Sequence, residues 1–202
     1  MSPDLWVGGR SGMRDQFVRC LENTNRVGIK DLLNWIEGTD FYRAPASSQG
    51  HNNYEGGLLE HSLEVYFKLL DVIKISEYPN IPSESIAISA LLHDICKANF
   101  YHADGRNRKD AVTGKWFIEP YFSIDDKFPL GHGEKSVIVI QQFMKLTPHE
   151  IVAIRWHMAG FDDSARAYAG GLAMTKAYKE YPLAVLLHVA DLLACYPGEE
   201  KR

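Results

Sequence analysis

Leu91-Leu92-His93-Asp94-Ile95-Cys96-Lys97 places a histidine directly beside an aspartate at the end of an apolar run with helical periodicity. Neighbouring side chains of a helix point about 100° apart, so the two residues can meet one metal ion from two directions. The dipeptide alone means little, because His-Asp pairs occur by chance in many proteins. The pair becomes informative because further histidines and an aspartate occur along the chain, at His61, His132, His157 and Asp191.

These positions stand in recognisable local sequences. They are Gly56-Gly57-Leu58-Leu59-Glu60-His61-Ser62, Gly131-His132-Gly133-Glu134-Lys135, Arg155-Trp156-His157-Met158 and His188-Val189-Ala190-Asp191-Leu192. The order H…HD…H…H…D resembles the HD-domain metal-dependent phosphohydrolases, a helical superfamily named for the dipeptide. The resemblance covers almost all of residues 13–196 and is greatest to small uncharacterised bacterial and phage-associated HD proteins. A more distant likeness, through Ala44-Pro45-Ala46 and the Gly-Gly-Leu run, is to the HD domain of a bacterial 3′-5′ exoribonuclease.

Composition narrows the class of protein. The chain has 202 residues, enough for one domain with a substantial core, and its formal net charge of −4 argues against duplex nucleic acid as a partner. Its three cysteines are far apart and form no CxxC pair, which fits a reducing compartment. No apolar run approaches the roughly 20 residues that span a bilayer, and no signal peptide is evident. We therefore expect a cytoplasmic protein with no membrane partner.

Hydrophobic periodicity predicts a largely helical chain, and the family resemblance implies an all-α fold, a helical bundle of the HD type. The expected helices cover residues 13–22, 27–37, 58–75, 83–97, 132–145, 148–160, 172–181 and 183–195. Thr147, Pro148 and Glu150 form the signature of a capped helix start. The last helix is apolar on every side and is expected to be central.

Residues 99–131 interrupt the helical pattern. Val112-Thr113-Gly114-Lys115 can turn a hairpin, and the residues that follow, Trp116 to Ile118 and Tyr121 to Ile124, favour strands. Pro120 would confine the second strand to an edge. We predict a small β-hairpin excursion from a single HD domain over residues 13–202. Residues 1–12 are Gly- and Ser-rich and are expected to be a disordered N-terminal extension or a vector remnant.

Asp191 is the most informative acidic residue, because it stands in an apolar helix. An isolated buried carboxylate is very costly, so Asp191 needs a strong partner. The partner is either a metal ion or a buried salt bridge or hydrogen bond to a histidine such as His188, three residues earlier on the same helix face. His51, His102 and His149 are expected in loops or at the surface, with His51 close enough to the Gly-Gly run to reach the site.

The family resemblance implies a ligand set. It implies that His61, His93, Asp94 and Asp191 hold one divalent ion, while His132 and His157 either hold a second ion or contact phosphate. Mixed nitrogen and oxygen ligation suits Mn²⁺, Fe²⁺, Co²⁺, Ni²⁺ or Zn²⁺, and the sequence does not choose among them. Asp94 would serve catalysis and, in the arrangement with two ions, would bridge them, and Lys97 would neutralise a phosphate oxygen. Lys135 and Arg155 are weaker candidates for substrate phosphate contacts.

The function that follows is hydrolysis of a phosphate ester in a nucleotide or a similar small phosphorylated molecule, with water activated by the metal. One alternative is cleavage of short single-stranded oligonucleotides, for which Trp116, Phe117, Tyr121 and Phe122 offer stacking surfaces. Another is a non-catalytic nucleotide sensor that keeps the metal site for binding. The sequence does not specify the oligomeric state.

Overall fold

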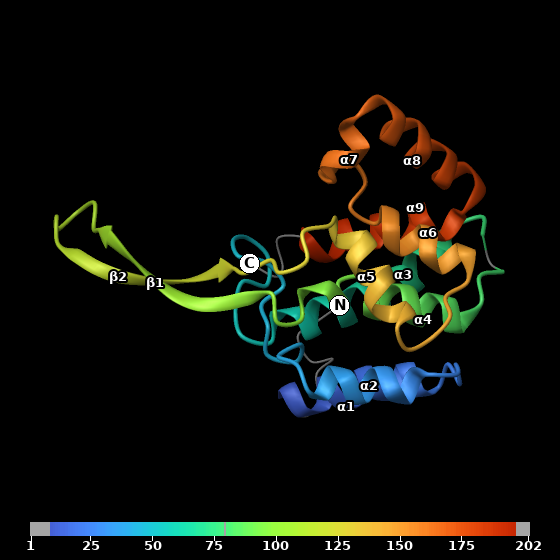
Figure 1. Cartoon of the computed structure of the whole chain (residues 1–202), viewed down its shortest axis with the longest axis horizontal. Coiled ribbons are helices and arrows are strands. Elements are labelled where there is room, and N and C mark those ends of the chain that lie inside the picture. The colour runs from blue at the N-terminus through green and yellow to red at the C-terminus, as the bar shows by residue number, and fades with distance from the viewer. Residues whose placement is uncertain (1–8, 79, 197–202) are drawn as a thin grey trace.

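The computed structural model describes residues 9–78 and 80–196, which form a helical body with a two-stranded arm projecting from it (Figure 1). This agrees with the predicted all-α fold and its β-hairpin excursion. The elements are α1 (Gly9–Glu22), α2 (Ile29–Glu37), α3 (Gly57–Ile75), α4 (Ser83–Leu92), the 3₁₀ turn η2 (Ile95–Lys97), β1 (Tyr101–Lys109), β2 (Trp116–Ile124), α5 (His132–Gln141), α6 (Pro148–Trp156), the 3₁₀ turn η3 (Ala159–Phe161), α7 (Asp163–Arg166), α8 (Tyr168–Glu180) and α9 (Pro182–Cys195).

The centre of the body is formed by α9 against α3 and α6. Apolar side chains from α3 and α9, among them Val65, Leu69 and Leu187, are fully buried in one core cluster. Helix α9 is central, as predicted, over most of its surface. One side is partly open to solvent, where Val189 and Leu193 are 37% and 44% exposed.

The first two helices form the lower layer of the body in Figure 1 and share a second core cluster with α3 and α4. Phe17 and Leu32 are fully buried there against residues such as Leu91. Helix α1 begins at Gly9, four residues before Met13, so it includes residues 9–12 of the predicted extension. Residues 1–8, the rest of the predicted extension, lie outside the described residues.

The segment that carries the His-Asp pair is shorter than predicted. Helix α4 ends at Leu92, and the chain passes through His93 and Asp94 into η2 instead of continuing as an α-helix to Lys97. Asp94 leaves the helical region of backbone space, with φ −111° and ψ 19°. The two side chains are therefore presented by the end of a helix, and the 100° spacing of a continuous helix does not set their directions.

Other boundaries differ from the predictions, among them the start of α8 at Tyr168 instead of residue 172. Helix α5 ends at Gln141 instead of Lys145, and α6 ends at Trp156, so that His157 follows the helix instead of lying inside it. The predicted loop after Gly160 contains the short helix α7, whose start is capped by the Asp162 carboxylate accepting from the Ser164 amide. Short helices of this kind depend on local capping and give little periodic signal.

The arm is an antiparallel hairpin in which Tyr101 pairs with Ile124 and Lys109 with Trp116. Strand β2 continues through Pro120, which is tolerated because both strands of a two-stranded sheet are edges. Alternation along the strand divides the four aromatic residues proposed for base stacking between the two faces. Trp116 and Phe122 lie on one face, and Phe117 and Tyr121 lie on the other.

No helix within residues 9–78 and 80–196 is both long and apolar enough to cross a bilayer.

Glu150 joins three parts of the body at the start of α6. Its buried carboxylate accepts hydrogen bonds from the Arg26 guanidinium at 2.7 and 3.2 Å and from the Ser85 hydroxyl at 2.7 Å. It also accepts from the Thr147 amide at 2.8 Å, and the Thr147 hydroxyl accepts from the Glu150 amide, which completes the predicted capping box. One carboxylate therefore ties the segment before α2 and the first turn of α4 to α6.

Replacing Glu150 with Ala should destabilise the fold, because it leaves the Arg26 guanidinium without its buried partner. Breaking a buried ion pair costs about 3–5 kcal/mol, and we expect a loss of that order in the free energy of unfolding, measured by urea titration at pH 7. Glu180→Ala, at the exposed end of α8, is the matched control, with a change within about 0.5 kcal/mol. Equal unfolding midpoints for Glu150→Ala and the wild type would contradict this role.

The wild type and Glu150→Ala also test the direction in which folding stability changes with pH. Burial alone would raise the pKa of the Glu150 carboxyl, but the hydrogen bonds from Arg26, Thr147 and Ser85 hold it below its ordinary value. Its stabilisation is therefore fully present above the unfolded-state pKa of about 4.3 and is lost as the pH falls through the lower folded-state pKa. The stability difference between wild type and Glu150→Ala should narrow in that acidic range.

Candidate metal centre

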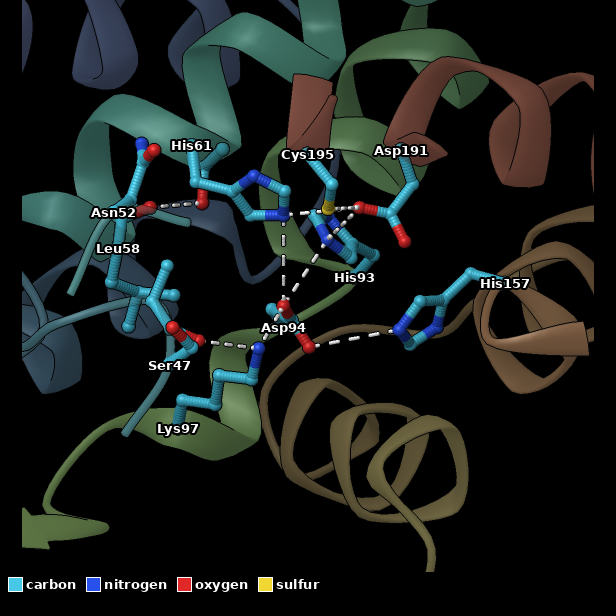
Figure 2. Close-up of polar contacts among 12 residues, drawn as sticks. Ser47, Asn52, Leu58, His61, His93, Asp94, Lys97, His157, Asp191 and Cys195 are labelled. Carbon is cyan, nitrogen blue, oxygen red and sulfur yellow. Dashed lines mark hydrogen bonds and ion pairs between the residues drawn. The ribbon is translucent and has the colours of Figure 1, made fainter. Parts of the chain in front are cut away.

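Five of the predicted ligands converge in the interior, although they are spread over 131 positions of the chain. His61 comes from α3, His93 and Asp94 from the end of α4, His157 from the end of α6, and Asp191 from α9 (Figure 2). All five side chains are buried. The helices that form the core thus also carry the polar cluster, and core packing fixes the relative positions of these side chains.

Two carboxylate oxygens lie at the centre of the cluster. The His61 Nε2 atom is 3.1 Å from Asp191 Oδ1 and 3.8 Å from Asp94 Oδ2. The His93 Nε2 atom is 3.3 Å from Asp94 Oδ2 and 4.0 Å from Asp191 Oδ1. Ligand atoms that share one ion at bond lengths of about 2.0–2.3 Å lie roughly 3–4 Å apart. These four residues therefore have the spacing of a single coordination shell.

The second oxygen of Asp94 faces a different histidine. Asp94 Oδ1 lies 3.6 Å from His157 Nε2, whereas Oδ2 faces His61 and His93. A carboxylate whose two oxygens face separate nitrogen groups has the geometry of a bridging ligand. This arrangement suits the predicted shared role of Asp94.

Backbone hydrogen bonds orient two of the imidazole rings. His93 Nδ1 lies 2.8 Å from the Ala90 carbonyl, and His157 Nδ1 lies 2.7 Å from the Ile154 carbonyl. A carbonyl can only accept, so Nδ1 carries the proton in each ring, and in the neutral ring Nε2 carries a lone pair. Both lone pairs are directed into the cluster, as are the carboxylate oxygens.

The cluster fits a cation because three of its inward atoms have no hydrogen-bond partner. His93 Nε2, His157 Nε2 and Asp94 Oδ1 are buried without a hydrogen bond among the described residues. Leaving a buried polar atom unsatisfied costs about 1–3 kcal/mol, and lone pairs that face carboxylate oxygens add repulsion. A divalent ion would satisfy these atoms together, and nitrogen plus carboxylate ligation is the chemistry such ions accept.

Lys97 completes the charge balance on one side of the cluster. Its Nζ atom donates to Asp94 Oδ2 and to the Ala46 carbonyl, both at 2.7 Å. Burial alone would raise the pKa of Asp94, but Lys97 and the neighbouring histidines hold that pKa well below its ordinary value. Burial would likewise lower the pKa of Lys97, but the Asp94 carboxylate raises it. Asp94 is thus ionised and Lys97 is protonated across the neutral pH range.

Asp191 is also held as an anion. Burial opposes its ionisation, but the hydrogen bond and charge of His61 outweigh burial and lower the pKa of the Asp191 carboxyl. The centre therefore contains two carboxylates at neutral pH, with Lys97 beside Asp94 and His61 beside Asp191. Two buried carboxylates at one point suit a divalent cation.

A cavity of about 320 Å³ opens onto the cluster. Its wall includes His132, which is half-buried, with its ring 5.7 Å from that of Phe100 and its Nδ1 3.6 Å from the Cys96 sulfur. Burial lowers the pKa of His132. His132 therefore lines the same cavity as the metal cluster, as a neutral imidazole, but it contacts Cys96 and Phe100 and not the five converging residues.

Two predicted phosphate contacts lie elsewhere. The Lys135 ammonium binds both oxygens of Asp126, at 2.7 and 2.8 Å, and lies over the Phe100 ring. Arg155 pairs with Glu134 and Asp162 and stacks on Trp156. Both cations already have anionic partners, and neither belongs to the cavity wall. The structure therefore does not bring Lys135 or Arg155 to the substrate position expected for them.

His188 and Cys195 also differ from the expectations. His188 Nδ1 lies 2.6 Å from the His157 carbonyl, so it supports the segment that carries His157, and not Asp191. Cys195 is absent from the predicted ligands, although it follows Asp191 by four residues and its sulfur lies 3.6 Å from Asp191 Oδ1. The i, i+4 spacing on one helix is the signal that places it beside Asp191. His51 reaches the cavity wall, as expected from its place before the Gly-Gly run.

Comparison with known proteins agrees with this geometry. The family model described as the HD domain matches residues 58–195, a range that includes all six predicted ligands. Over 147 residues the chain is 39% identical to a dihydroneopterin 2′,3′-cyclic phosphate phosphodiesterase of Methanocaldococcus jannaschii, which aligns 70% of this chain and 51% of that protein. The chain thus spans about half the length of this curated relative.

No solved structure shows a significant match to the chain. The family model covers well over half of the sequence and contains the buried His-Asp cluster described above. The chain therefore belongs to the HD domain family.

Proposed function

We propose that the chain is a metal-dependent phosphohydrolase that cleaves a phosphate ester of a nucleotide or a similar small phosphorylated molecule. The observation that carries the proposal is the buried Asp94 carboxylate, with one oxygen toward His61 and His93 and the other toward His157. A divalent ion in such a site polarises water and phosphoryl oxygens and so supplies a nucleophile at neutral pH. His61, His93, Asp94 and Asp191 would hold it.

Lys97 would act as a fixed positive charge. Two of its three N–H bonds are directed to Asp94 and Ala46, and the third can donate to a phosphate oxygen in the cavity that Lys97 helps to line. Because its pKa is raised, Lys97 keeps its proton and stabilises negative charge instead of shuttling protons. Asp94 orients the Lys97 ammonium while it contributes to the metal centre.

The size and the lining of the cavity favour a small substrate with a flat ring system. Its volume of about 320 Å³ is at the lower end of the range for small-molecule sites. Aromatic and apolar side chains form much of its wall, namely Phe100, Tyr101, Ile124, Met158, Phe161, Leu192 and Tyr196. The similar M. jannaschii protein is a phosphodiesterase for a 2′,3′-cyclic phosphate. We therefore infer that a five-membered cyclic phosphodiester, of a nucleoside or a pterin, is the first substrate class to test.

Neither alternative gains support from a specific observation. For oligonucleotides, the four arm aromatics lie on opposite faces, and Tyr121 is engaged with Asp104 and Arg106. A base-stacking platform needs its rings on one surface. For a non-catalytic sensor, the ligand cluster would have no need of an ionised bridging carboxylate.

We also propose that residues 13–202 form one domain in a reducing compartment such as the cytoplasm. The packing of α1 and α2 into the core cluster of α3 and α4 supports the first inference, because these helices precede the region matched by the family model. The second is supported by Cys20, Cys96 and Cys195, all of which are free.

Turnover of 2′,3′-cyclic phosphates by the purified protein tests the function. We expect the wild type with Mn²⁺, Co²⁺, Ni²⁺ or Zn²⁺ to open the cyclic diester to a phosphomonoester, as P–O ester cleavage by one water requires. Asp94→Asn should lower that rate by more than about 100-fold, because loss of even a supporting residue of a metal site costs 10- to 100-fold. Asp163→Asn, on an exposed carboxylate, is the matched control and should turn over normally.

The same panel should contain 5′-nucleotides, a generic phosphodiester, a generic phosphomonoester and short single-stranded RNA. Circular dichroism of each variant establishes that it is folded. Wild-type rates from folded Asp94→Asn would remove the proposed catalytic centre. Metal-dependent nucleotide binding by the wild type without turnover of any compound would support the sensor instead.

Metal stoichiometry distinguishes one ion from two. If His157 and His132 belong to a second ion, replacing either with Ala should reduce bound metal, measured by mass spectrometry of dialysed protein, from about two ions per chain to about one. The side-chain directions favour His157 over His132, so we expect the larger loss from His157→Ala. Unchanged metal content with a raised KM in both variants would make them phosphate contacts beside a single ion.

A further inference from the structure

A second group of potential metal ligands adjoins the proposed centre. It consists of His51, His61 and Cys195, with one ligand atom from each lying within 4.8 Å of the others. His51 comes from the loop before α3, whereas Cys195 is the last residue of α9. Figure 2 places the Cys195 sulfur beside His61 and Asp191, on the side of the centre away from His157.

The distances in this group are those of a coordination shell. The Cys195 sulfur is 3.4 Å from His51 Nε2 and 3.6 Å from Asp191 Oδ1, and Asp191 Oδ1 is 3.1 Å from His61 Nε2. At bond lengths of about 2.0–2.3 Å, neighbouring ligand atoms of one ion lie roughly 3–4 Å apart. Small side-chain adjustments would therefore bring two imidazoles, a sulfur and a carboxylate onto one ion.

Each residue of the group is held where a ligand is needed. The Ser47 hydroxyl donates to the His51 carbonyl at 2.7 Å, which fixes the loop, and the His51 ring lies 5.1 Å from the His61 ring. His61 is 1% exposed, and its Nε2 atom faces Asp191 Oδ1. Cys195 and His51 are half-buried and line the cavity, so an ion can reach them.

We propose that His51 and Cys195 supply an imidazole and a thiolate to the same ion that His61 and Asp191 hold, so that the centre selects Zn²⁺ or another borderline-soft ion. The inference rests on the proposed function, because His61 and Asp191 also belong to the proposed HD-type ligand set. Formation of the sulfur–metal bond releases the thiol proton to solvent.

The ligand chemistry decides which ions respond. A thiolate adds strongly to the binding of Zn²⁺, Co²⁺ and Cd²⁺, whereas Mn²⁺ prefers oxygen and nitrogen ligands. The alternative is a purely structural role, in which the thiol donates to Asp191 and accepts a hydrogen bond from His51. Removing a structural hydrogen bond would affect all ions alike. Removing a ligand should affect soft ions selectively.

The experiment compares Zn²⁺ and Mn²⁺ affinities of the wild type and Cys195→Ser by competition with a chelating indicator. We expect the Zn²⁺ affinity to fall at least about 10-fold in Cys195→Ser, while the Mn²⁺ affinity stays within about 2-fold. His51→Gln should weaken Zn²⁺ binding in the same direction. Cys20→Ser, on α1, is the matched cysteine control and should leave both affinities unchanged.

Cobalt substitution provides a spectroscopic readout that does not depend on turnover. Co²⁺ bound to the wild type should show a thiolate-to-metal charge-transfer band in the near ultraviolet, and Cys195→Ser should lack it. Persistence of the band in Cys195→Ser, with its loss in Cys96→Ser, would assign the thiolate to the cysteine beside His132 and overturn the proposal. So would equal losses of Zn²⁺ and Mn²⁺ affinity in folded Cys195→Ser.

The two proposals fail in different ways. A protein that hydrolyses phosphate esters with Mn²⁺, but shows no charge-transfer band and no selective loss of Zn²⁺, retains the proposed function without the thiolate ligand. A protein that shows the Cys195-dependent band and Zn²⁺ preference, but hydrolyses nothing, retains the ligand group without the function.

Discussion

The burial of the ionised Asp94 carboxylate is the constraint on which the site depends. A carboxylate removed from water is tolerated only with close positive or donating partners, because its desolvation is otherwise very costly. Lys97 supplies one charge at 2.7 Å, and His61, His93 and His157 approach within 3.3–3.8 Å. The lone pairs of His93 and His157 cannot satisfy the carboxylate without a cation. The fold thus holds a cluster that could bind a metal ion.

The helical body makes this cluster possible. Helices α3 and α9 pack along the core, and α4 and α6 end beside them, so four chain segments present polar side chains at one point while their other faces bury apolar surface. The backbone contributes as well. The Ala90 and Ile154 carbonyls orient the His93 and His157 rings with the lone pairs inward. The cluster is therefore positioned by the same packing that stabilises the domain.

Much of this could be predicted from the sequence. Helical periodicity located the main helices, the apolar helix around Asp191 marked that carboxylate as needing a strong partner, and the family resemblance implied His61 and His93. The end of α4 at Leu92 could not be predicted, because the apolar pattern continues through Ile95 and only the three-dimensional site shows why Asp94 leaves the helix. The partners of Lys135 and Arg155 lie in irregular segments, at Asp126 and Asp162, which periodicity does not position. The i, i+4 spacing on α9 places Cys195 beside Asp191. Its contact with His51, however, joins residues 144 positions apart.

Anomalous diffraction from crystals grown with Mn²⁺ or Zn²⁺ tests most directly the claim that the buried cluster is a metal site. Data recorded on either side of the metal absorption edge locate the ion without any assumption about activity. We expect a peak within about 2.0–2.3 Å of His61, His93, Asp94 and Asp191 ligand atoms. A saturated protein with no anomalous peak at these residues, or with its peak only elsewhere on the surface, would contradict the metal centre.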